Sequence, residues 1–106
     1  MKRLDVKTED GELLCPHCSN NFMHHTDVQV FQRKEDAEQV ALTTTHSGQT
    51  TVKLVDNYTS KNPSLRRHGV RLYCWCESCN ESMYLAIAQH KGHSRITWEI
   101  DNGNNT

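Results

Sequence analysis

Two cysteine pairs, far apart along the chain, constrain its fold more than any other feature. The first pair lies in the sequence CPHC and the second in CESC. A C-x-x-C pair suits zinc because its tight turn aims both sulfurs at one point, and two such turns supply a tetrahedral set. A site closed by four thiolates has no open position for water, so it is structural rather than catalytic. The predicted ligands of this structural Zn²⁺ ion are Cys15, Cys18, Cys76 and Cys79.

Composition indicates that the chain needs such a staple. Only 35% of its 106 residues are hydrophobic, below the usual ~45–50% apolar share, which also counts glycine. Domains with thin cores often depend on a metal or on disulfides. We expect residues 13–100 to form a single zinc-ribbon-like β domain, after a flexible segment at 1–12 and before a disordered tail at 101–106.

The cysteine count and the N-terminus indicate a reducing compartment. The chain has five cysteines, and an odd count would leave one unpaired in a secreted protein. The first residues contain no apolar run suited to a signal peptide, and no stretch approaches the roughly 18 apolar residues that span a membrane. We therefore expect a cytoplasmic protein with reduced thiols and no membrane partner.

Residue patterns of period two predict an all-β fold. Residues 22–31 form an extended stretch, and 39–46 and 50–55 form a hairpin around the Ser47-Gly48 turn. This hairpin is an insertion between the two cysteine pairs. Residues 33–38 form either a helical turn or a loop, and 56–69 form one long loop.

The C-terminal half predicts an antiparallel meander. Its strands are 70–76, 83–90 and 95–100, joined by the Cys76–Cys79 turn and by Lys91-Gly92. In the first of these strands Val70, Leu72, Cys74 and Cys76 share one face. The opposite face carries Arg71, Tyr73 and Trp75.

Several side chains near the cysteine pairs have two interpretations. Cys74 is a small buried core residue, or else a substitute ligand or redox-sensitive thiol. His17, His24 and His25 are polar surface residues, or else further ligands. The four thiolates already complete a site, which favours the first interpretation for each.

The quoted motifs resemble a family of small, uncharacterised bacterial and phage zinc-ribbon proteins. The resembling stretches are CPHC with FMHHTDVQVFQRKEDAE, NPSLRRHGVRLYCWCESC and LAIAQHKG, within residues 13–98. The resemblance implies a zinc-binding all-β domain and implies no activity. One departure is Asn80, where ribbons often have glycine; asparagine tolerates the left-handed backbone required there.

The first functional hypothesis is nucleic-acid binding. The net charge of −1 excludes a generally basic nucleic-acid binder, but no acidic residue lies between Asp56 and Glu77 or between Glu81 and Glu99. Basic groups there can meet phosphates while aromatic rings stack on unpaired bases. The alternative for the rings is packing against the inserted hairpin. The predicted contact residues are Arg66, Arg67, Arg71, Trp75, Lys91 and Arg95.

The other hypotheses involve different chemistry. A protein-interaction adaptor, in its simplest form a homodimer, would use the threonine-rich edge of the 39–55 hairpin. A thiol-disulfide oxidoreductase would use CPHC, although no βαβ pattern surrounds it. A metal-dependent nuclease would use His24, His25 and Asp27. We expect a binding module rather than an enzyme, without a small-molecule substrate.

Overall fold

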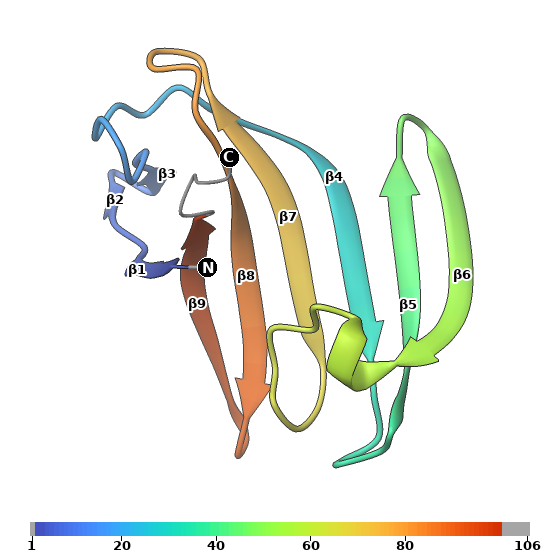
Figure 1. Cartoon of the computed structure of the whole chain (residues 1–106). Helices are drawn as coiled ribbons and strands as arrows, with labels where there is room; N and C mark the ends of the chain where they lie inside the picture. The colour runs from blue at the N-terminus through green and yellow to red at the C-terminus, as the bar shows by residue number, and fades with distance from the viewer. Residues whose placement is uncertain (1, 101–106) are drawn as a thin grey trace.

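The computed structural model describes residues 2–100 as an all-β protein built on one seven-stranded sheet (Figure 1). Neighbouring strands run antiparallel, in the order β1-β9-β8-β7-β4-β5-β6. Its strands are β1 (Lys2–Asp5), β4 (Met23–Gln32), β5 (Gln39–His46), β6 (Gln49–Asp56), β7 (Gly69–Cys76), β8 (Ser82–His90) and β9 (His93–Ile100). Outside it lie a hairpin of β2 (Thr8–Glu9) and β3 (Glu12–Leu13) and a 3-10 helix, η1 (Asn57–Thr59). In this described part of the chain, no helix has the length and apolar character needed to cross a membrane.

The strands predicted from period-two patterns are confirmed. β5 and β6 are the inserted hairpin, and β7, β8 and β9 are the meander. Both hairpin turns have positive φ at their two central residues, 51° and 79° at Ser47-Gly48 and 50° and 81° at Lys91-Gly92. Such turns match the twist of the flanking strands. Residues 33–38 are a loop, and the predicted 56–69 loop contains η1.

The N-terminal segment differs from the flexible one expected from its charges. Lys2–Asp5 form β1, which pairs with β9 and places Leu4 opposite Trp98. Leu4 and Val6 both pack against a buried cluster of the sheet, so two apolar side chains among charges are enough to order this segment. The tail 101–106, predicted to be disordered, lies outside the described residues.

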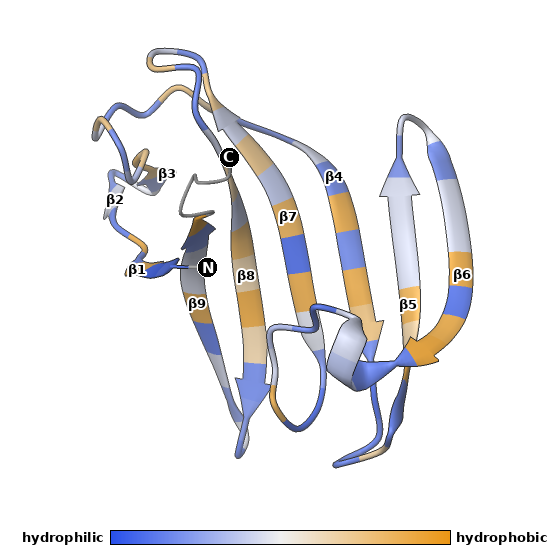
Figure 2. Cartoon of the chain, viewed as in Figure 1, coloured by the Kyte–Doolittle hydropathy of each residue, from blue (hydrophilic) through white to orange (hydrophobic). Residues whose placement is uncertain are grey.

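The core consists of two clusters on opposite faces of the sheet. The knuckle cluster lies on the face of β7 that carries Leu72 and Cys74, which we call the knuckle face; its buried members are Cys15, Cys74, Cys76, Met83, Trp98 and Ile100. The loop cluster lies on the other face, the loop face, which carries Arg71 and Tyr73; its buried members are Phe31, Val40 and Leu42. Each face is therefore covered over only part of its area. Figure 2 shows the alternation of hydrophobic and hydrophilic residues that produces the two faces.

The uncovered part of the knuckle face carries a continuous row of β-branched side chains. Strand pairing places these six residues side by side across six strands, and we call them the β-branched row: Val52, Thr43, Val30, Val70, Ile87 and Ile96. None of the six belongs to either buried cluster. At the two ends of the row, Val52 is 69% exposed and Ile96 is 51% exposed.

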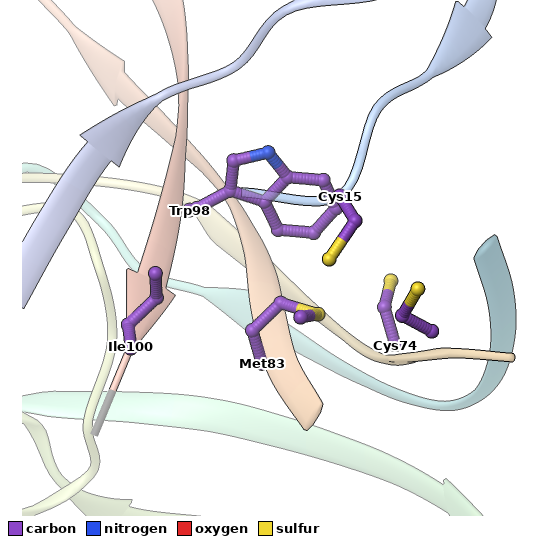
Figure 3. Packing of buried hydrophobic residues seen from close by; sticks show 6 residues of the cluster. Cys15, Cys74, Met83, Trp98 and Ile100 are labelled. Carbon is purple, nitrogen blue, oxygen red and sulfur yellow. The ribbon is translucent and has the colours of Figure 1, made fainter. Parts of the chain in front are cut away.

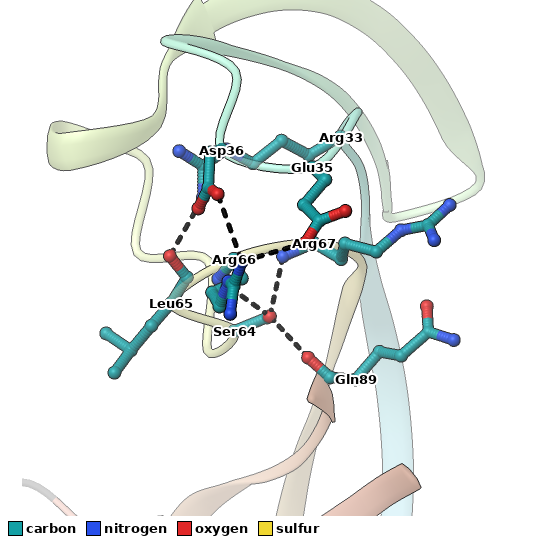
Figure 4. Close-up of polar contacts among 8 residues, drawn as sticks. All are labelled: Arg33, Glu35, Asp36, Ser64, Leu65, Arg66, Arg67 and Gln89. Atoms are coloured by element: carbon teal, nitrogen blue, oxygen red, sulfur yellow. Dashed lines mark hydrogen bonds and ion pairs between the residues drawn. The ribbon is translucent and has the colours of Figure 1, made fainter. Parts of the chain in front are cut away.

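The 57–68 loop covers the loop face at the other end of the sheet. A Cβ atom at Gly69 would lie 2.2 Å from Asn62 Oδ1 and 2.7 Å from the Pro63 ring, so only glycine fits beneath the loop. The loop is held by Ser64, whose hydroxyl donates to the Gln89 carbonyl at 2.7 Å, and by buried Arg33, which donates to the Leu65 carbonyl at 3.0 Å (Figure 4).

A buried ion pair joins β7 to the far strand of the meander. Arg71 Nε donates to Glu99 Oε1 at 2.8 Å, and its NH1 donates to Gln29 Oε1 at 3.0 Å. The guanidinium also lies over the Tyr84 ring, 3.8 Å from its centroid. Both charged side chains are almost fully buried, at 4% and 2% exposure. Removing one partner of such a pair leaves an uncompensated charge, which costs more than removing both.

We predict that Arg71→Met lowers the free energy of unfolding by about 3–5 kcal/mol, because Glu99 stays buried and keeps only the half-exposed Arg3, 3.8 Å away, as a cationic partner. The double variant Arg71→Met/Glu99→Leu should recover most of this loss, since both charges are replaced by apolar groups. Urea unfolding of the metal-loaded proteins measures both values. Equal stability of the single and double variants would show that the pair is not coupled.

Candidate metal centre

The two C-x-x-C turns, or knuckles, have the same backbone geometry. The amide of Ser19 donates to the Cys15 carbonyl at 2.9 Å, and the amide of Asn80 donates to the Cys76 carbonyl at 2.9 Å. Ser19 and Asn80 occupy the same position after each knuckle and have left-handed φ values of 67° and 63°. The departure from glycine at residue 80 therefore leaves the turn intact, as predicted from the tolerance of asparagine.

The sheet brings the two knuckles together at one end. The first lies between β3 and β4 and the second joins β7 to β8. β4 and β7 are neighbours, with Met23 opposite Cys76. The amide of Glu77 also donates to the Phe22 carbonyl at 2.9 Å. The two knuckles are distant in sequence. They meet because β4, which follows the first knuckle, pairs with β7, which precedes the second.

The four sulfurs form a compact cluster. Cys15 Sγ lies 3.7 Å from Cys79 Sγ, and Cys18 Sγ lies 3.6 Å from Cys76 Sγ. All four lie within 4.8 Å of one another. A tetrahedron with Zn–S bonds of ~2.3 Å has edges of about 3.8 Å, so the donor set and its dimensions fit a four-thiolate metal ion. Among residues 2–100, this is the one group of three or more metal-ligating side chains that converges.

The metal centre rests on the knuckle cluster. Trp98, which is fully buried, lies beside Cys15, and Met83 and Cys74 belong to the same buried cluster as Cys15 and Cys76 (Figure 3). Cys15 and Cys76 are buried, whereas Cys18 is exposed and Cys79 is partly exposed. One side of the centre is therefore packed against the core and the other side faces solvent.

The thiols of the cluster differ in acidity. Burial raises the pKa of Cys15 to about 12. Burial also opposes ionisation of Cys76, but backbone N–H groups of Cys79 and Ser78 and the Cys18 thiol together bring the pKa of Cys76 down to about 7. Since thiolates are the metal ligands, binding must displace protons from the other cysteines.

The remaining candidate ligands do not join the sulfurs. Cys74 is 1% exposed, and its Sγ contacts the Leu72 carbonyl, in agreement with its interpretation as a small core residue. His24 pairs with Glu77 at 2.7 Å and stacks on Trp75, with ring centroids 4.3 Å apart. Asp27 pairs with His46 at 2.6 Å.

The structure separates His24, His25 and Asp27, the residues that a metal-dependent nuclease would use. His24 lies opposite Trp75 on the loop face, and His25 lies opposite Cys74 on the knuckle face. A β-bulge separates His25 from Val28, so Asp27 contacts a different strand. The three residues named for the nuclease do not converge on one point.

The predicted nucleic-acid contact residues are divided by the structure. Arg66, Arg67 and Lys91 line one hollow at the end of the sheet, and Arg95 lies on β9 opposite Ala88. Trp75 lies at the other end of β7, next to the second knuckle, about 20 Å along the strand from Gly69. Arg71 is buried and cannot meet a phosphate.

Two of the arginines already have acidic partners. Arg66 donates to Glu35 at 2.8 Å and to Asp36 at 3.2 Å (Figure 4), and Arg71 pairs with Glu99. These pairs are not apparent from the sequence, because Glu35, Asp36 and Glu99 lie far along the chain from the arginines that they contact. Within residues 2–100, Arg67, Lys91 and Arg95 make no ion pair.

The aromatic side chains on the loop face pack on their neighbours, not on the inserted hairpin. Tyr73 and Tyr84 meet edge to face with centroids 5.6 Å apart. The hairpin extends the sheet beyond β4 rather than folding over it, so the packing considered in the sequence analysis is wrong. All three rings, including Trp75, are partly buried.

Comparison with known proteins found no match to the chain among family models, curated proteins or solved structures. No family is therefore identified, and what the structure supports of the resemblance is the four-cysteine cluster that suggests a metal site.

We predict that chelation of the metal unfolds at least the knuckle end of the domain. Structural zinc contributes an apparent ~10–16 kcal/mol in small peptides, whereas domains keep about 5–15 kcal/mol of net stability. Cys76→Ser should therefore lose both the metal and the folded circular-dichroism signal. Cys74→Ala, two residues away on the same strand face, should keep one metal ion per chain. Unchanged melting after chelation would contradict the prediction.

We predict that Ser19→Gly stabilises the protein by about 1 kcal/mol, because a left-handed conformation costs ~1–2 kcal/mol in a residue with a Cβ. Asn80→Gly should gain less, since asparagine tolerates this conformation. Thermal melting of the metal-loaded variants compares the two knuckles directly. An equal or larger gain at Asn80 would contradict the explanation.

Proposed function

We propose that this protein is a non-catalytic binding module of a reducing compartment, in which one zinc ion holds the fold and the uncovered knuckle face binds protein. The observation that carries the proposal is the β-branched row, a continuous uncharged surface across six strands. Contiguous exposed apolar surface on a small soluble domain marks interaction sites.

The chemistry of the metal centre supports a structural role for the ion. All four donors are cysteine sulfurs, and four-thiolate zinc sites are closed to water and substrate. The centre contacts the core through Trp98, Met83 and Cys74, so its loss would disrupt the largest buried cluster. Zinc is favoured over metals with hard oxygen ligands because the donors are soft thiolates.

Nucleic-acid binding is the weaker proposal. Electrostatic affinity for phosphates depends on basic groups that are free to release counterions, and Arg66 and Arg71 are engaged by carboxylates. The remaining basic groups, Arg67, Lys91 and Arg95, are few and are separated from Trp75. Electrophoretic shifts with single-stranded and duplex oligonucleotides at two salt concentrations test this proposal, and we expect no shift at moderate salt.

We predict that a photo-crosslinking amino acid in place of Val52 forms covalent adducts with protein in cells, because this position opens onto the uncovered face. The same amino acid in place of Thr51, the neighbouring exposed residue on the opposite face of β6, should give few adducts. Gel mobility and mass spectrometry of the purified adducts measure the difference. Equal yields from the two positions, or none from either, would count against a protein-binding knuckle face.

A further inference from the structure

We infer that the partner of the knuckle face is a second copy of this chain, stacked face to face through the β-branched row. The inference rests on the proposed function, since it names the protein that the uncovered face binds. It differs from the dimer considered in the sequence analysis, which pairs strand edges. Here the backbone hydrogen bonds of the two sheets stay separate and side chains alone meet.

The first argument is charge. The knuckle face of the six strands from β6 to β9 has a row of paired positions on each side of the β-branched row. One flanking row holds Thr50, Thr45, Val28, Leu72, Leu85 and Trp98. The other holds Leu54, Ala41, Gln32, Gln89 and Ser94. None of these positions carries Asp, Glu, Lys or Arg, so an identical face meets no like charge.

The loop face of the same strands has the opposite character. It carries Lys53 on β6, Arg71 on β7, and Arg95 and Glu99 on β9. On the knuckle face of the described strands, charged side chains lie only at the margins of the sheet: Lys2 on the edge strand β1, and Asp56, the last residue of β6, whose carboxylate accepts a hydrogen bond from the Tyr58 amide. This segregation is the pattern of a sheet whose uncharged side packs against another sheet, as in a β-sandwich.

The second argument is area. Each same-face position occupies ~4.8 Å across the strands and ~6.8 Å along them, or about 33 Å². Three positions of the face, Leu72, Leu85 and Trp98, are already packed in the knuckle cluster. The open remainder of the three rows on six strands is roughly 490 Å². Two copies would bury roughly 980 Å², which is close to the ~1,000 Å² at the lower limit for a specific interface. The dimer should therefore be reversible, with a dissociation constant on the order of 1–100 μM.

The third argument is the shape of the side chains. Every member of the β-branched row is Val, Ile or Thr, whose stiff side chains pack well against a pleated surface. Sheets stacked in this way lie ~10 Å apart, with interdigitating side chains.

Sedimentation velocity of the zinc-loaded full chain, from about 1 to 200 μM, tests the inference. The wild-type protein should change from monomer to dimer across this range. Val52→Lys and Ile96→Lys each place a charge in the face, and each should weaken the dimer by roughly tenfold or more. Both residues are more than half exposed, so the variants should keep the metal content and melting temperature of the wild-type protein. Thr51→Lys, which adds the same charge to the loop face, should leave the dimer intact.

The outcomes separate this inference from the proposed function. A wild-type chain that stays monomeric overturns the inference that the partner is a second copy. A dimer that is equally strong in Val52→Lys, Ile96→Lys and Thr51→Lys overturns it as well. If the chain is monomeric while the crosslinker at position 52 captures a different protein, the second copy is overturned and the protein-binding face stands. A monomer without position-specific crosslinks overturns both. A dimer weakened by the two face variants alone, with crosslinks from position 52 to the same chain, supports both.

Discussion

The sulfur cluster is the contact on which the rest of the structure depends. It joins a turn near the N-terminus to a turn between β7 and β8, across more than half of the chain. Closing so long a loop costs entropy that grows with the logarithm of its length, and a thin core supplies little to offset it. The Cys15 side chain also serves the core directly, since it is buried against Trp98. Metal binding and core formation are thus one event at this end of the sheet.

Local patterns predicted much of the fold because the sheet is built from neighbours in sequence. The β5–β6 hairpin and the meander need only alternating faces and short turns, and Ser47-Gly48 and Lys91-Gly92 both supply left-handed angles. The same signal was present and overlooked at Asp10-Gly11, where φ values of 51° and 80° close the β2–β3 hairpin. Aspartate followed by glycine is among the strongest hairpin signals, so the order of this segment was predictable in principle.

The metal ligands were predictable from local sequence, whereas the partners of the arginines were not. A C-x-x-C pair encodes its own turn, so the ligand set follows from spacing, and the four sulfurs meet as expected. The partners of the arginines are set by strand order instead. Arg71 meets Glu99 because β8 lies between their strands and both face the same side. Arg66 meets Glu35 because two loops converge at one end of the sheet. Neither relation can be read from the distribution of charges along the chain.

Which part of each face is covered was also beyond sequence analysis. The pattern of β7 shows that Val70 and Cys74 share a face. It does not show that the knuckles cover Cys74 and leave Val70 partly exposed. Coverage depends on how far the N-terminal segment reaches across the sheet, and it stops at the row of Leu72, Leu85 and Trp98. The next row along, from Val52 to Ile96, has residues as apolar as those beneath the knuckles.

A metal ion offers a physical reason for this arrangement. An apolar face reserved for a partner cannot contribute its burial energy to the isolated chain, which leaves a small domain short of stability. A four-thiolate centre supplies that stability from a compact site at one end of the sheet. The long β-strands can then keep an uncharged surface open while the monomer remains folded. On this view the thin core and the strong metal centre are two consequences of the same requirement, namely that one face of the sheet stays available for binding.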